Sequence, residues 1–304
     1  MHATSPASRA GAAVVVECDV RPAGPYRLPG AGRDGVVRRR GHALRRLVHH
    51  GDEPAVVGAW PVAGAVRLRA EAPSRPAALY GIERMRFALA LDHDPAPFQR
   101  RFRRDPLLGP AIRRCPWLRP QRLAEPFQAL VWAIAEQLIT VERAWGIQRR
   151  LVWRFGRQSA CRTLRDAPSA MVIGGRSPAE LEACDLAGRR AVAMVRAGRE
   201  VAAGRVDLTE HEPAWRRLRT ISGIGSWTLE KLAFHGQGRD DQLPAGDLAH
   251  IQLVGRLLGL GRRATEDEVR AFYAPYAPWT GLAGIYALRG TMTVTGSRRG
   301  AGRW

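Results

Sequence analysis

Two glycines flank one apolar residue at Gly223-Ile224-Gly225, and helical patterns of apolar residues lie on both sides of them. Glycine adopts backbone angles that other residues avoid, so this sequence predicts a tight hairpin between two helices. The backbone of such a hairpin can approach a ligand closely. A helix that begins near Trp227 would also turn free N–H groups and the positive end of its dipole toward a phosphate. An ordinary helix–helix turn is the alternative interpretation of this short pattern.

A carboxylate follows the hairpin by about twenty residues, in the segment Leu243-Pro-Ala-Gly-Asp247. Asp247 stands at the predicted start of the next helix, where an aspartate commonly accepts a hydrogen bond from the first turn. The simplest role for Asp247 is therefore that of a helix cap. Together with the hairpin, however, it also forms the pattern of a site that holds a phosphate backbone and presents one acid to it.

The charge of the chain favours a phosphate-rich partner. Lys plus Arg number 48 against 28 Asp plus Glu, which gives a net charge of +20. Each phosphate that a basic residue neutralises releases condensed counterions, so such an excess favours nucleic acid. A merely soluble basic surface is the alternative. Almost all of the basic residues are arginines, since Lys231 is the only lysine.

The cysteines and the hydropathy narrow the class further. Cys18, Cys115, Cys161 and Cys184 are scattered without a Cys-x-x-Cys spacing, which predicts neither a zinc nor an iron–sulfur site. Unpatterned cysteines are typical of a reducing compartment. No stretch approaches the ~18 apolar residues of a membrane helix. We therefore expect a soluble, cytoplasmic protein.

The elements divide into a β-rich start and a helical remainder. Ala13–Val20, Pro54–Val62 and the alternating residues from Val66 predict strands, and Arg75–Leu91 predicts a helix. Beyond Pro95, apolar residues recur at helical spacing. Three helix starts carry a hydroxyl three residues before a glutamate, which predicts capping boxes. The hydroxyls are Ser177, Thr209 and Thr265.

Polar residues interrupt the apolar stripe between Glu125 and Phe155. Glu136 and Gln137 precede Leu138-Ile139, and Thr140 is a suitable cap for a second helix. These residues predict a corner between two helices. At such a corner Gln137 and Leu138 are free to point outward.

Three blocks of this sequence resemble the helix–hairpin–helix DNA glycosylase superfamily, most closely its AlkA-type 3-methyladenine DNA glycosylases. They are Glu125-Pro-Phe-Gln-Ala-Leu with Glu136-Gln-Leu-Ile-Thr, then Leu218–Thr228, then Leu243-Pro-Ala-Gly-Asp247-Leu. A weaker block is Tyr276-Ala-Pro-Trp279. The resemblance covers roughly residues 95–290, and the β-rich start is similar to the family's N-terminal sheet domain in position and strand content.

The resemblance implies that a base is flipped out of duplex DNA and its N-glycosidic bond hydrolysed. Asp247 would be the catalytic carboxylate, which stabilises positive charge at the sugar and positions water. Leu138 would fill the gap that the base leaves, with Gln137 beside it. Trp227 would stack on the electron-poor base. Plain core packing is the alternative for Leu138 and Trp227. The hairpin implied to hold the DNA backbone comprises Ser222, Gly223, Ile224, Gly225, Ser226 and Thr228.

The lysine count bears on the reaction. Glycosylase–lyases of this superfamily attack the sugar with a lysine at the position that Trp227 occupies here, so the resemblance implies hydrolysis by water. Lys231 lies four residues farther on, on the same helix face, where AlkA-type sequences often carry an aromatic residue. We expect Lys231 to form a salt bridge or to face a phosphate, although an amine near the base is the open alternative. Glu136 replaces a typical glycine and Leu248 an aromatic residue, so both belong to the expected pocket.

We therefore expect an α+β protein, in which residues 1–94 form a β-rich domain and residues 95–290 form the helix–hairpin–helix core. Residues 291–304 would form a basic, mobile tail. The expected function is monofunctional excision of alkylated purines (3-methyladenine, 7-methylguanine) from double-stranded DNA, by a monomer associated with the nucleoid. No organic cofactor is expected, and the resemblance suggests a monovalent cation at the hairpin backbone. The alternatives are a glycosylase for deaminated or oxidised bases and a non-catalytic protein that binds damaged DNA.

Overall fold

The computed structural model describes residues 13–295 of the chain. Its first part is a five-stranded antiparallel sheet in the order β1-β5-β4-β3-β2. The bounds are β1 Val14–Val20, β2 Val37–Arg40, β3 Ala43–His50, β4 Glu53–Val62 and β5 Ala65–Ala72. One-sided burial follows from alternation: Val66, Leu68 and Ala70 on β5 point into a core and the residues between them do not.

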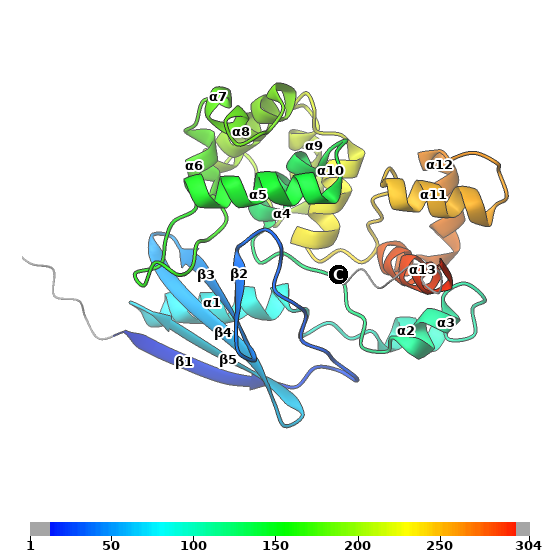
Figure 1. The fold of residues 1–304 in the computed structure, drawn as a ribbon, viewed down its shortest axis with the longest axis horizontal. Coiled ribbons are helices and arrows are strands. Elements are labelled where there is room, and N and C mark those ends of the chain that lie inside the picture. Colours follow the sequence, from blue (N-terminus) through cyan, green and yellow to red (C-terminus); the bar gives the residue numbers. More distant parts are fainter. Residues whose placement is uncertain (1–12, 296–304) are drawn as a thin grey trace, which may run out of the picture.

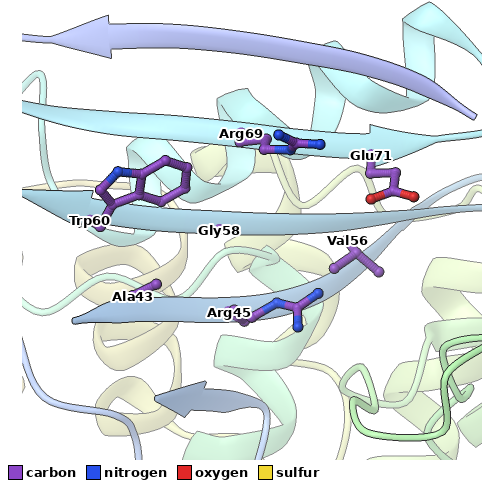
Figure 2. A pocket seen from close by; sticks show the side chains of 7 residues that line it. All are labelled: Ala43, Arg45, Val56, Gly58, Trp60, Arg69 and Glu71. Carbon is purple, nitrogen blue, oxygen red and sulfur yellow. The ribbon is translucent and has the colours of Figure 1, made fainter. Parts of the chain in front are cut away.

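Helix α1 (Arg75–Ala88) covers the inner face of the sheet (Figure 1). Its close approach depends on Gly81, where an added Cβ would lie 2.7 Å from a methyl of Val57. Ser74 caps the helix from an extended conformation. The opposite, outer face carries a shallow hollow of about 250 Å³, which Arg45, Trp60, Arg69 and four neighbouring residues line (Figure 2).

The helices after the sheet form two groups with separate cores. The first group packs around α4 (Pro126–Glu136), α5 (Val141–Phe155) and α8 (Gly188–Ala202). Its other members are α6 (Ala170–Gly174), α7 (Pro178–Glu182), α9 (His211–Leu218) and α10 (Ser226–Lys231), which continues as the π-turn η1 (Leu232–Gly236). Helix α4 is apolar nearly all round because it is enclosed in this core.

The second group joins segments that are far apart in the sequence. Helices α2 (Ala96–Phe102) and α3 (Gly109–Arg114) pack with α11 (Leu248–Leu257), α12 (Glu266–Tyr273), η2 (Ala274–Tyr276) and α13 (Thr280–Thr295) (Figure 1). The rings of Phe98 and Tyr286 lie 5.1 Å apart across this junction. The chain thus leaves the first group after α10 and re-enters the second group at α11, with Asp247 at the point of entry.

The structure confirms the α+β architecture and the predicted corner after α4. Capping boxes are present at Ser177 and Thr265. The box predicted at Thr209 is wrong: α9 begins at His211, and Asp207 instead accepts hydrogen bonds from the amide and hydroxyl of Thr209. These local bonds compete with the cap.

The start of the predicted mobile tail is helical. Helix α13 continues to Thr295 because no proline or glycine interrupts the segment from residue 291 to residue 295. Residues 296–304 lie outside the described part of the chain. Within that part, no helix is long and apolar enough to cross a membrane.

Candidate functional site: a glycine hairpin, an exposed leucine and one carboxylate

The hairpin between α9 and α10 presents backbone on one side and anchors itself with side chains on the other. Ile221 and Ile224 are buried in the first helical core, whereas Ser222, Gly223 and Gly225 are exposed. Gly223 has a φ of +92°, a region that side chains rarely adopt, and Gly225 has open space where a Cβ would be. At Gly223 and Gly225 the exposed rim of the hairpin is therefore backbone without side chains.

The corner after α4 places Leu138 in solvent. The Leu138 side chain is fully exposed and its φ is +55°, so a large apolar residue stands outward in a left-handed conformation. Thr140 caps α5 directly afterwards. The carbonyls of Ala135 and Gln137 both accept hydrogen bonds from Arg190 on α8, at 2.8 and 3.1 Å. The corner is thus held firmly although its tip makes no packing contact.

Gln137 joins this corner to the hairpin. Its amide nitrogen donates to the carbonyl of Gly223 at 2.8 Å and to the hydroxyl of Thr228 at 2.9 Å. Thr228 is itself buried, so its hydroxyl supports the hairpin from the interior side. Gln137 is directed to the hairpin rather than outward, in contrast to the sequence-based expectation.

Lys231 forms a salt bridge with Glu136 across the gap between α10 and α4. The Glu136 carboxylate also accepts a hydrogen bond of 3.0 Å from the amide of Gln148. The Lys231 ammonium lies 5.1 Å from the centre of the Trp227 ring, within cation–π range. The indole N–H of Trp227 is buried and has no hydrogen-bond partner within residues 13–295. Trp227, Lys231 and Glu136 therefore form one cluster, as the helical spacing of four residues predicts for the first two.

Asp247 is the N-cap of α11, and its carboxylate accepts a hydrogen bond of 2.9 Å from the amide of Ala249. Among the described residues, the second carboxylate oxygen of Asp247 accepts no hydrogen bond. Leu248, next to it, is about half exposed. Asp247 therefore caps its helix as expected and keeps the capacity to act on something else.

A buried residue of α10 anchors the loop that carries Asp247. The carboxylate of Glu230, buried beneath the surface, accepts a hydrogen bond of 3.2 Å from the amide of Ala245 and pairs with Arg270 of α12 at 2.5 Å. Burial raises the pKa of Glu230, and Arg270 opposes that shift. The position of Asp247 is thus set jointly by α10 and α12.

His250 lies one turn along α11 and is almost fully buried beside Tyr273. Burial lowers its pKa to about 4; the Asp247 carboxylate opposes this shift and the Lys231 ammonium adds to it. His250 therefore lies within electrostatic reach of both groups and is neutral at physiological pH.

Sequence reasoning missed Gln148, Glu230 and His250. Each is a polar residue on the buried face of its helix. In the sequence, the only signal is that a polar residue interrupts a run of apolar positions at helical spacing. A buried polar residue implies a polar or aromatic partner, but the sequence does not identify that partner. Only the fold shows that Gln148, Glu230 and His250 contact Glu136, Ala245 and Tyr273, respectively.

Metal and cofactor sites are limited by what the side chains provide. No group of three or more His, Cys, Asp or Glu side chains suited to a metal ion occurs between residues 13 and 295. A monovalent cation at the hairpin would depend on backbone carbonyls. Those of Ile221 and Gly223 already accept hydrogen bonds, from the amide of Ile224 and from Gln137, and a carbonyl has a second lone pair for an ion. The hairpin therefore fits such an ion without requiring it.

No family model matches this chain. It is 24% identical over 206 residues to the DNA-3-methyladenine glycosylase of Bacillus subtilis, which covers 66% of this chain and 68% of the relative. It is 26% identical over 178 residues to the DNA-3-methyladenine glycosylase 2 of Escherichia coli, with 55% and 58% covered. The chain therefore spans only about two thirds and just over half of these relatives' lengths.

The fold agrees with the solved 3-methyladenine DNA glycosylase from Archaeoglobus fulgidus. The TM-score is 0.75 at 19% identity, over 90% of this chain and 97% of the other. The chain thus shares the fold of this glycosylase. In sequence it is similar to the DNA-3-methyladenine glycosylases of the AlkA type.

Proposed function

We propose that this protein, acting as a monomer on chromosomal DNA in the nucleoid, is a monofunctional glycosylase for alkylated purines. One observation carries the proposal, namely that helix α10 contacts every part of the candidate site. Thr228 supports the corner with Leu138, Glu230 holds the loop of Asp247, and Lys231 engages Glu136. A duplex bound at the hairpin would thus meet both Leu138, as a wedge between bases, and the Asp247 carboxylate. Helix α10 would hold these two residues in a fixed relative position.

The hairpin backbone would bind the phosphates that flank a lesion, and the net charge of +20 would attract the duplex. Leu138 would enter the stack in place of the extruded nucleotide. An apolar side chain in that gap offsets part of the unstacking cost, and a damaged base costs less to extrude. The full exposure of Leu138 supports this role because no packing contact must be broken first.

Asp247 would act on the sugar. As the bond between sugar and base breaks, positive charge develops on the sugar ring, and a nearby carboxylate stabilises it. The same carboxylate would position a water molecule and accept its proton. Alkylated purines leave readily because they carry a positive charge, so this reaction needs no strong general acid. Hydrolysis is supported by the salt bridge of Lys231, which occupies the only lysine in the chain.

The test is release of free bases from duplex DNA treated with a methylating agent, for the wild type and for Asp247→Asn. We expect the wild type to release 3-methyladenine or 7-methylguanine and the variant to lose at least two orders of magnitude in rate. Binding of the variant to lesion-containing duplex should persist. Tight lesion binding without any release by the wild type would contradict catalysis, and equal release by both proteins would remove Asp247 from the mechanism.

A further inference from the structure

The cluster of Lys231, Glu136 and Trp227 places an ion pair where a flipped base is proposed to stack. The two charged side chains are only 17% and 22% exposed. The ammonium lies over the indole at 5.1 Å, and Glu136 is fixed from its other side by Gln148. Interactions between charges strengthen where water is excluded, so this pair acts on any base that reaches Trp227.

A positive charge at this place affects binding according to the charge of the base. An N-alkylated purine is a cation, so it would approach a ring that already has an ammonium beside it. A deaminated purine is neutral and meets no such repulsion, and its ring nitrogens and carbonyl oxygen can accept a hydrogen bond from the ammonium. Glu136 offsets part of the repulsion. The net charge of the Lys231–Glu136 pair therefore affects the affinity for a cationic base relative to that for a neutral base.

The same charge affects the chemical step in one direction for both kinds of base. When the glycosidic bond breaks, both of its electrons stay with the base, while the sugar cation is captured by water and the water's proton passes to Asp247. A neutral base thus departs with a negative charge, and a cationic base departs neutral. In both cases the base becomes more negative by one unit, and a nearby ammonium stabilises that change.

We infer that the Lys231–Glu136 pair determines the lesion range of this enzyme and extends it toward neutral, deaminated purines. This inference rests on the proposed glycosylase function. Stabilisation by Lys231 during bond breakage assists a neutral base, which departs as an anion. For a cationic base the same charge costs affinity, so the two effects partly cancel.

The experiment compares two duplex oligonucleotides under single-turnover conditions, one with a single hypoxanthine and one with a single 7-methylguanine. Lys231→Met should lower the maximal rate on hypoxanthine on the order of tenfold and tighten the apparent affinity for 7-methylguanine. Glu136→Gln should move the ratio of the two activities in the opposite direction. The double variant should return toward the wild-type ratio, and Lys231→Arg, which keeps the charge, should retain it.

Arg67→Met and Asp19→Asn provide a matched control. They change the net charge by the same amounts as Lys231→Met and Glu136→Gln, but at an exposed ion pair on the sheet, far from the site. Neither control variant should move the ratio. A purely structural salt bridge would make Lys231→Met and Glu136→Gln equally harmful to both substrates, and that result would overturn the inference. A ratio that no variant moves would also overturn it. Release of neither base by the wild type would instead overturn the proposed function itself.

Discussion

The side-chain amide of Gln137 binds the backbone carbonyl of Gly223 at 2.8 Å, between positions 86 residues apart in the chain. One of these segments carries the exposed Leu138 and the other carries the bare hairpin. Leu138 is the proposed wedge and the hairpin the proposed phosphate-binding loop. A fixed distance between them would determine which base pair is opened relative to the phosphates that are bound. Gln137 therefore acts as the spacer of the proposed DNA-binding surface.

Gln137→Ala should weaken DNA binding more than it weakens the fold. The variant leaves the hydroxyl of Thr228 without its partner inside the protein, so we expect a loss of about 1 kcal/mol in the free energy of unfolding. The affinity for a duplex with an abasic site should fall about tenfold because the hairpin and the corner lose their register. Urea unfolding and fluorescence anisotropy measure the two quantities.

A matched control is Gln158→Ala, which removes an exposed side-chain bond of 3.0 Å to the carbonyl of Arg162. This change should leave DNA affinity unaltered. An unchanged affinity in Gln137→Ala, together with the expected loss of stability, would show that the link serves the fold alone.

Leu138→Gly should separate stability from function. The side chain makes no packing contact and its φ is +55°, where glycine is unstrained, so the variant should be more stable by roughly 1 kcal/mol. Excision from duplex DNA should nevertheless fall because the glycine cannot fill the gap in the stack. Release from single-stranded DNA, which has no such gap, should change little. Equal losses on both substrates would contradict a wedge role.

Asp247 has two roles that two substitutions can distinguish. Asparagine is as good a helix cap as aspartate, so Asp247→Asn should keep the melting temperature while base release is lost. Asp247→Ala removes the bond to the Ala249 amide as well, and the free energy of unfolding should fall by about 1 kcal/mol. Calorimetry on the two variants measures the difference. An Asp247→Asn protein that unfolds as readily as Asp247→Ala would mean that the negative charge itself stabilises α11.

His250 predicts a specific dependence of stability on pH. Its pKa in the folded protein is about 4, below the ordinary value of 6.5, so the unfolded chain binds a proton more readily. The contribution of His250 to stability is complete above pH 6.5 and is lost as the pH falls toward 4. Between pH 7 and pH 5 this amounts to about 2 kcal/mol.

His250→Leu removes that proton, so the stability of the variant should decline less over the same interval than that of the wild type. Urea titrations at several pH values provide the measurement. Identical pH profiles for the two proteins would place the titration on other groups.

Local patterns predicted the hairpin, the corner and the cap at Asp247, because each depends on a few adjacent residues. The strand β3 was not predicted. Its sequence Ala-Leu-Arg-Arg-Leu-Val-His-His hides the alternation, since the inward Arg46 is buried and donates to Gln128 of α4 at 2.5 Å. The packing of α2 and α3 against α11–α13 was also not predicted. Contacts between segments far apart in the chain produce no periodic pattern in the sequence of either segment.

The salt bridge of Lys231 has a practical consequence, because it contains the only lysine amine in this chain. Reductive methylation with ¹³C-formaldehyde would place one side-chain NMR reporter in the protein, besides the chain terminus, and that reporter would stand beside Trp227. Amine-directed coupling to a sensor surface has the same selectivity. It would leave every arginine unmodified and attach the molecule either by its terminus or through the proposed base site, so immobilised protein would be a mixture of active and blocked molecules.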